Sequence, residues 1–156
     1  MLEVDGRNLS QSGAILTWLA ETTGHFAPAE NQRIEALRWI LFDNHKLTSY
    51  TATLRFLRTF TKDPDPAVIA FLRTRAEGAW KVLDAHLATR AYVAADRLTI
   101  ADISLCGYLF WPEEIGVGDW SGFPHLAQWL ERIRSEPRWV APYDLVPGHP
   151  LPARAA

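Results

Sequence analysis

The helix start that decides the fold reads Leu98-Thr99-Ile100-Ala101-Asp102-Ile103. Thr99 stands just before the first helical turn and Asp102 three residues later, so each side chain can accept a hydrogen bond from the other's backbone N–H. Leu98 and Ile103 can pack against each other across this capping box. We expect the helix to span residues 98–110, and it is apolar on nearly all sides, which is typical of the centre of a helical bundle.

Two long helices are predicted before this central helix. Residues 31–60 contain neither Gly nor Pro and carry apolar side chains at helical spacing, which predicts one long helix, straight or bent. Asp65 and Pro66 favour a new helix start, because proline fits the first helical position. The second helix has a single apolar stripe, so we expect the two helices to pack as an antiparallel hairpin.

The first thirty residues predict a strand and a helix. Residues 2–4 favour a short strand for which no partner strand is apparent. Ser10 is a suitable N-cap for a helix that begins at Gln11, and Gly24 is a suitable residue to end it. Residues 26–29 interrupt the helical pattern and mark a candidate domain boundary.

The sequence after the central helix predicts one more helix and an irregular tail. Pro112 kinks or ends the central helix, and Pro124 opens the next one. From Pro142 onward the chain is rich in proline, which favours irregular structure. We expect this tail to pack back over the bundle through Tyr143 and Leu145.

Composition excludes several classes of function. The chain has 156 residues, a mass of 17.6 kDa and a net charge of −2, so no overall positive field attracts nucleic acid or an anionic membrane. The longest apolar stretches fall far short of the ~20 residues that span a bilayer. The single cysteine, Cys106, excludes an intrachain disulfide and fits a cytoplasmic protein. The histidines show no metal-binding spacing, so we expect no metal.

Three motifs together resemble the glutathione transferase family. Residues 92–105, which contain the capping box, are similar to that family's central helix signature, and residues 123–133 are similar to its next helix. Residues 9–16 resemble the Glu/Gln-Ser motif at the end of the family's thioredoxin-like domain. The resemblance implies an all-α helical bundle of the family's C-terminal type, preceded by a short strand-helix remnant of a thioredoxin-like domain.

The same resemblance implies a division of the chain. Residues 1–26 correspond to the remnant of the thioredoxin-like N-terminal domain, residues 29–141 to the helical C-terminal domain, and residues 142–156 to the irregular tail. A complete member of the family begins with further strands and helices that carry the catalytic Tyr, Ser or Cys. We therefore expect an N-terminally truncated chain that is inactive alone, assign no catalytic residue, and leave open whether the chain is itself an enzyme.

The resemblance gives Gln11 and Ser12 a binding role. In the family this pair holds the γ-glutamyl end of glutathione, with the serine and the helix N-terminus taking the carboxylate and the Glu or Gln side chain meeting the amino group. A helix N-terminus with free N–H groups is a suitable carboxylate site on physical grounds as well. From the residues alone, the alternative that Ser10 and Ser12 merely cap the helix stays open.

Other candidates are less sharply defined. Asn44 and His45 lie near the family region that reaches across the dimer toward the partner's glutathione, although an exposed helix face is an alternative. Tyr50, Tyr108 and Trp111 could line the pocket for the electrophile, and the alternative is that they belong to the core. We expect Cys106 to be a small buried hydrophobic residue rather than a reactive thiol.

The function implied by the resemblance is conjugation or exchange of glutathione on small electrophiles in the complete protein. Glutathione would be the co-substrate, the partner a small-molecule electrophile, and the assembly a homodimer in the cytoplasm. We also expect self-association through the unpartnered strand at residues 2–4 and the apolar face of the first helix, formed by Leu16, Trp18 and Leu19. An alternative function is a non-catalytic helical protein-interaction module, and a decayed gene fragment is a third possibility.

Overall fold

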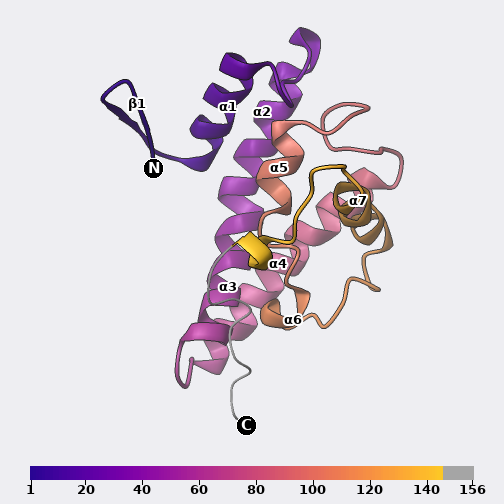
Figure 1. Cartoon of the computed structure of the whole chain (residues 1–156). Coiled ribbons are helices and arrows are strands. Elements are labelled where there is room, and N and C mark those ends of the chain that lie inside the picture. The colour runs from indigo at the N-terminus through magenta and orange to yellow at the C-terminus, as the bar shows by residue number, and fades with distance from the viewer. Residues whose placement is uncertain (146–156) are drawn as a thin grey trace.

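The body of the computed structural model, which describes residues 1–145, is a pair of long antiparallel helices (Figure 1). The first is continuous and consists of α2 (Arg33–Phe42), a π-helical turn η2 (Asp43–Leu47) and α3 (Thr48–Phe60). It packs against α4 (Pro66–Leu87), which begins as expected at Pro66, with the Asp65 carboxylate accepting from the N–H of Ala67 at 2.8 Å. The hairpin predicted from the apolar spacing is confirmed, whereas the π-helical turn was not foreseen.

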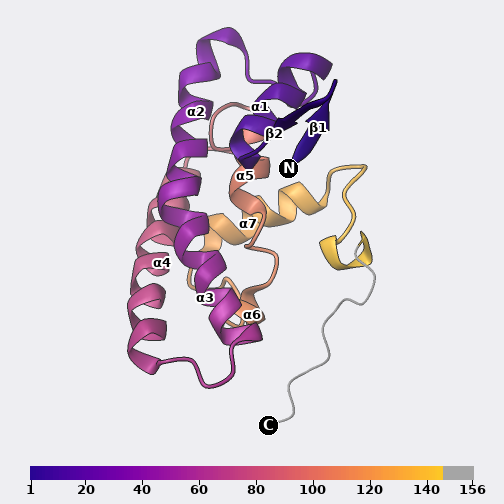
Figure 2. The ribbon, with the colours of Figure 1, turned by 90° about the vertical axis from the view of Figure 1, so that its left-hand side faces the viewer.

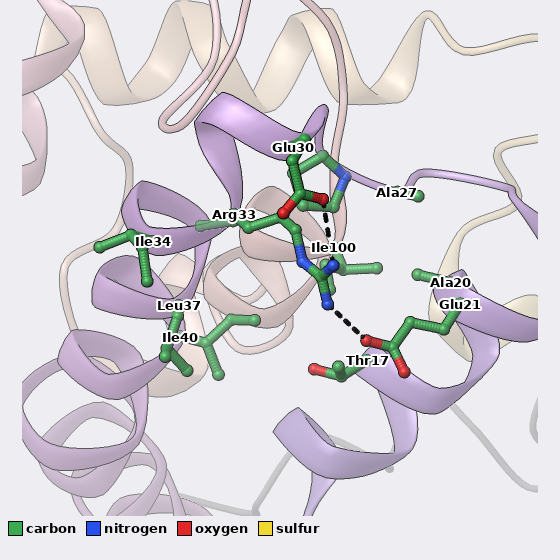
Figure 3. A pocket seen from close by; sticks show the side chains of 12 residues that line it. Thr17, Ala20, Glu21, Ala27, Glu30, Arg33, Ile34, Leu37, Ile40 and Ile100 are labelled. Carbon is green, nitrogen blue, oxygen red and sulfur yellow. Dashed lines mark hydrogen bonds and ion pairs between the residues drawn. The ribbon is translucent and has the colours of Figure 1, made fainter.

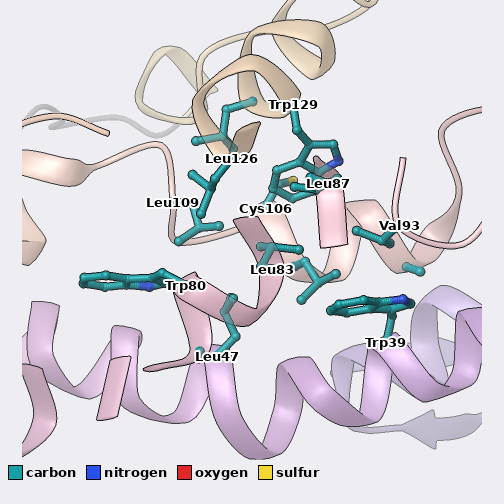
Figure 4. Packing of buried hydrophobic residues seen from close by; sticks show 14 of the residues in the cluster. Trp39, Leu47, Trp80, Leu83, Leu87, Val93, Cys106, Leu109, Leu126 and Trp129 are labelled. Atoms are coloured by element: carbon teal, nitrogen blue, oxygen red, sulfur yellow. The ribbon is translucent and has the colours of Figure 1, made fainter. Parts of the chain in front are cut away.

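The central helix α5 (Ile100–Cys106) packs against α1 (Ser12–Thr23), α2 and η2, as its apolar surface predicts. Helix α7 (Pro124–Arg134) packs against α4. Figure 4 shows the core between these helices, where large side chains are fully buried, among them Trp39, Trp80 and Trp129. The Trp80 Nε1–H donates to the buried hydroxyl of Thr51 at 3.1 Å, so this indole does not leave a polar atom unsatisfied in the core.

The central helix is shorter than the predicted range 98–110. Residues 107–110 form a tight turn, in which the Leu109 N–H donates to the Cys106 carbonyl at 3.0 Å. The Leu109 carbonyl in turn accepts from the Trp120 indole at 2.8 Å. Because a residue before proline is disfavoured in helical conformation, Trp111 is non-helical, with φ −124° and ψ 61°, and the short helix α6 (Pro112–Ile115) starts after it.

The N-terminal strand has a partner, contrary to expectation. Strand β1 (Leu2–Val4) pairs antiparallel with β2 (Arg7–Leu9), with Leu2 opposite Leu9. Asp5 and Gly6 connect the strands with positive φ angles of 48° and 74°, the geometry of a tight hairpin turn. The three residues of β2 are too few and too polar to show alternation, so the sequence pattern could not reveal the strand.

The hairpin lies beside helix α1 (Ser12–Thr23), and Figure 2 shows both on the side of α5 that faces away from α4. Gly24 ends α1 with a φ of 74°, as predicted. A single 3₁₀ turn, η1 (Glu30–Gln32), then leads into α2. Helix α1 packs on α5, so the remnant and the bundle are in direct contact.

The C-terminal segment packs back onto the bundle through Tyr143 but not through Leu145, which is exposed. Residues 142–145 form a 3₁₀ turn, η3 (Pro142–Leu145), and the remainder of the expected irregular tail, residues 146–156, lies outside the described residues. Within residues 1–145 no helix combines the length and apolar character needed to cross a bilayer.

Candidate functional site

Helix α1 begins without a side-chain cap. The residue at its N-cap is Gln11 rather than Ser10, and no side chain accepts a hydrogen bond from the first turn. The first bond of the helix runs from the Ile15 N–H to the Gln11 carbonyl at 3.0 Å, so the N–H groups of the preceding residues have no intrahelical partner. The prediction that Ser10 caps the helix was wrong, because Gln11 occupies the N-cap position and makes no side-chain cap.

The backbone of Gln11 is strained. Its φ of 69° and ψ of 119° are sparsely populated for a residue other than glycine, and such geometry costs about 1–3 kcal/mol. This residue occupies the N-cap position of α1, and its side chain makes no capping hydrogen bond to the first turn. Strained residues that persist in a fold cluster at binding sites.

The first turn of α1 sits tightly on the long helix. A Cβ atom on Gly13 would lie 2.7 Å from Ile40 Cγ2 and 3.3 Å from Asn44 Nδ2, so only glycine fits at this approach. Asn44 therefore lies close to Gly13, the residue after Ser12, in the same chain. The contact with a partner subunit's glutathione that the resemblance implies for Asn44 and His45 stays a prediction. His45 is exposed on the same π-helical turn.

Asp43, next to Asn44, is a buried carboxylate that the sequence did not single out. It is 2% exposed and accepts from the hydroxyls of Thr48 and Ser104, both at 2.5 Å. Burial raises the pKa of this carboxyl, and the two hydroxyl donors offset part of the effect. The polar run at residues 43–45 inside an otherwise helical pattern was the only sequence signal.

The three aromatic candidates for an electrophile pocket do not meet in one place. Tyr108 and Trp111 are neighbours, with ring centroids 6.3 Å apart, and the Arg55 guanidinium lies over both rings at 5.9 and 4.3 Å. Tyr50 instead lines a separate cavity of about 380 Å³ beside α4, together with Phe42 and other residues. The structure thus brings together two of the three predicted residues.

Arg55 belongs to a polar cluster that connects three elements. Its Nε donates to Glu114 at 2.6 Å and its Nη2 donates to the Tyr143 hydroxyl at 2.7 Å, while that hydroxyl donates to Glu114. The Tyr143 ring stacks on Trp111 with a centroid separation of 5.2 Å. These contacts join residues 29 to 88 positions apart, so no local pattern could predict them.

The capping box on α5 is closed and buried. Asp102 Oδ2 accepts from the Thr99 N–H at 2.9 Å, and Oδ1 accepts from the Val93 N–H at 2.9 Å and the Trp129 indole at 3.0 Å. Burial raises the pKa of the Asp102 carboxyl, although all of these donors favour its charged form. The structural role predicted for Thr99 and Asp102 is confirmed.

Cys106, also on α5, is unsuited to thiol chemistry. It is buried, and burial raises the pKa of its thiol to about 12. A thiol with such a pKa is almost wholly protonated at neutral pH and is a poor nucleophile. Among the described residues, no group of three or more His, Cys, Asp or Glu side chains is placed to hold a metal ion.

Two further cavities border α1 and α5. Figure 3 shows one of about 350 Å³ between α1 and α2, where Arg33 forms ion pairs with Glu21 at 2.9 Å and Glu30 at 3.1 Å. The other, about 710 Å³ and mainly apolar, lies beside α5 and includes Phe26, Phe110 and Trp139 in its lining. Neither cavity includes Gln11 or Ser12 in its lining.

Comparison with known proteins assigns the family. Residues 47–137 match the family model for the glutathione S-transferase C-terminal domain, so the chain belongs to the glutathione transferase family. It is 28% identical to the disulfide-bond oxidoreductase YfcG of Escherichia coli, over 83% of this chain and 60% of YfcG. The chain therefore spans about three fifths of the length of that relative.

Solved structures show the same fold. A possible glutathione S-transferase from Rhodopseudomonas palustris is 34% identical, with a TM-score of 0.82 over 89% of this chain and 64% of that one. A glutathione transferase from Burkholderia graminis, 26% identical, has a TM-score of 0.70 over 83% of this chain and 57% of that one. The latter was solved with two glutathione molecules bound per subunit.

Proposed function

We propose that this chain carries the γ-glutamyl part of a glutathione site, in a protein that conjugates or exchanges glutathione on small electrophiles. The uncapped N-terminus of α1, with its strained Gln11, is the observation that carries the proposal. The glutathione bound to the Burkholderia graminis relative supports it, because that protein shares this fold at 26% identity.

The chemistry of the site follows from the open helix end. The α-carboxylate of the γ-glutamyl group accepts from the free N–H groups at the start of α1 and from the Ser12 hydroxyl, and the positive end of the helix dipole stabilises its charge. The Gln11 side-chain carbonyl then accepts from the α-amino group. The Asn44 amide, close to Gly13, adds a further polar group at the edge of this site.

Tyr108 and Trp111 are the residues that we propose for contact with the electrophile. Their neighbouring rings offer an aromatic surface, and Arg55 over both rings is held by Glu114, so its charge is already balanced. Such a surface suits a planar apolar substrate rather than an anion. Tyr50 lies in a different cavity and is not assigned to this contact.

A second copy of the chain is the partner that we propose for an exposed apolar stripe on α2. Ile34, Leu37 and Leu41 lie on one face at helical spacing and are 78%, 48% and 58% exposed. On α1, by contrast, Leu16 packs against the core, Trp18 is partly buried and Leu19 is 38% exposed. The face first expected to associate is thus less exposed than the stripe on α2. A homodimer through α2 covers the stripe.

The cytoplasm is the location that we propose for the protein, since its single cysteine is buried and unpaired. A non-catalytic helical interaction module remains the alternative function, and the same stripe on α2 supports it. That alternative gives no reason for a strained residue and an open helix end at Gln11. The glutathione-binding function explains both features.

Equilibrium binding to the purified chain tests the proposal. We expect glutathione and γ-glutamylcysteine to bind with a dissociation constant on the order of millimolar, equivalent to about 4 kcal/mol, because only part of the site is present. Cysteinylglycine, which lacks the γ-glutamyl group, should not bind. Ser12→Ala should abolish binding, while Ser10→Ala, a neighbouring serine without a capping role, should leave it unchanged. The proposal would be contradicted if the wild-type chain bound all three ligands equally. It would also be contradicted if Ser12→Ala bound glutathione as tightly as the wild type.

A further inference from the structure

The π-helical turn η2 holds a buried carboxylate at an energetic cost. Asp43 is 2% exposed and accepts from two hydroxyl donors, Thr48 and Ser104, and within residues 1–145 no cationic side chain pairs with it. Burying a carboxylate without a cation is expensive, and burial raises the pKa of this group. Stability alone therefore does not explain why an acid occupies this position.

The turn itself is a second local cost. The Thr48 N–H donates to the Asp43 carbonyl five residues earlier, and the Ser49 hydroxyl donates to the Asn44 carbonyl. Single π-helical turns inside α-helices weaken the regular hydrogen bonding and are frequent at functional sites. The extra residue also rotates the face of α3 relative to α2 by about 100°, since one residue of an α-helix turns by that angle.

Both costs occur beneath the open end of α1. Asn44 lies within the turn and Ile40 one helical turn before it, and these two side chains are the ones that closely approach Gly13. Gly13 follows Ser12 directly, so any shift of Asn44 or Ile40 moves the N–H groups of the proposed carboxylate site. On the other side, Ser104 ties the Asp43 carboxylate to α5, the central helix of the bundle.

We propose that Asp43 is a positioning residue for the glutathione site: by tying the π-helical turn to Ser104, it fixes Ile40 and Asn44 as the surface on which the first turn of α1 rests. The carboxylate touches no part of the ligand and acts through the turn. This inference rests on the proposed function and assigns that site a buried support that connects it to the bundle core.

The test asks whether one variant loses glutathione affinity without losing thermal stability. Asp43→Asn removes the buried charge and replaces one of the two acceptor oxygens by an NH2 group. Either Thr48 or Ser104 therefore loses the acceptor to which its hydroxyl donates, and that tie loosens. We expect its midpoint of thermal unfolding to stay the same or rise, while glutathione affinity falls by about threefold to thirtyfold, the range for residues that act on a site without touching the ligand.

Asp84 provides the matched control. Its carboxylate accepts from the N–H groups of His125 and Leu126 at 2.9 Å each and so caps α7, away from α1. Asp84→Asn should lower the unfolding midpoint and leave glutathione affinity unchanged. Loss of affinity in Asp43→Asn only in proportion to lost stability, or unchanged affinity, would overturn the positioning role.

A second readout separates this inference from the proposed function. Amide hydrogen exchange at Ile15, whose N–H closes the first turn of α1, should be faster in Asp43→Asn, while exchange at Ala127 in α7 should not change. Unchanged exchange at Ile15 would overturn the support by Asp43 whatever the ligand does. Failure of the wild-type chain to bind glutathione, with faster exchange at Ile15 in the variant, would instead reject the function and leave Asp43 only a structural support of α1.

Discussion

Two helix N-termini in this chain are built in opposite ways. At the start of α5, the Asp102 carboxylate accepts hydrogen bonds from Thr99, Val93 and Trp129 and is wholly buried. At the start of α1, Gln11 provides no side-chain cap, its backbone is strained and the first turn faces outward. A closed, buried helix end stabilises the fold, whereas an open one remains available to a ligand with a negative charge.

The contrast shows that a serine or threonine near a helix start does not by itself identify a cap. Ser10 and Ser12 lie at the start of a helix, as Thr99 does, yet neither side chain caps the first turn of α1. The difference comes from the backbone of Gln11, whose positive φ cannot be read from local composition. In this chain the backbone conformation before the helix, and not the presence of a serine, decides whether a side chain caps the first turn.

The largest expected effect comes from opening the closed end. Asp102→Ala leaves the N–H groups of Thr99 and Val93 and the Trp129 indole without an acceptor in the core. We expect the free energy of unfolding to fall by about 3–5 kcal/mol, the cost of breaking a buried polar network. Urea denaturation measures it, and Asp119→Ala, on an exposed loop, should change stability by less than about 0.5 kcal/mol.

The next largest effect on stability is expected from removing the Thr99 hydroxyl, and removal of the Ser12 hydroxyl is its matched comparison. Thr99→Ala should lower the free energy of unfolding by about 1–2 kcal/mol, since it removes half of a buried capping box. Ser12→Ala should change it by less than about 0.5 kcal/mol, because the Ser12 side chain caps nothing. A loss of the same size in both variants, measured by the same denaturation, would remove the distinction between the two ends.

Relief of the strain at the open end should stabilise the protein. Gln11→Gly allows the positive φ without penalty, so we expect a gain of about 1 kcal/mol in the free energy of unfolding. The same variant should lose glutathione affinity, because the side chain that meets the amino group is gone. Thermal unfolding and equilibrium binding of one preparation measure both, and a destabilised Gln11→Gly would show that the strain is absent.

The smallest effect is a pH dependence near the closed end. His86 Nε2 contacts the Val93 carbonyl at 2.8 Å, and burial lowers the pKa of this histidine below its ordinary 6.5. The neutral ring is therefore favoured in the folded state, so its contribution to stability is present above pH 6.5 and is lost as the pH falls below that value. The unfolding midpoint should decline toward about pH 5, and His86→Leu should flatten that decline.

What the sequence could predict follows from how local each signal is. Thr99 and Asp102 are three residues apart, and the long helices carry their own periodicity, so the bundle and its central capping box were predictable. The strand β2, the π-helical turn at Asp43 and the pairing of Arg55 with Glu114 depend on contacts with distant residues or on backbone angles. The candidate site was predictable at Gln11 and Ser12 only through the family resemblance.

A residue-resolved titration of the chain with glutathione tests the open helix end most directly. In the amide ¹H–¹⁵N spectrum, we predict saturable shifts at Ser12, Gly13 and Ala14, and none at Ile100 and Ala101 at the start of α5. The shifts should vanish in Ser12→Ala. Absence of any change at the start of α1, or equal shifts at both helix ends, would contradict the claim that one end is open for a carboxylate and the other closed.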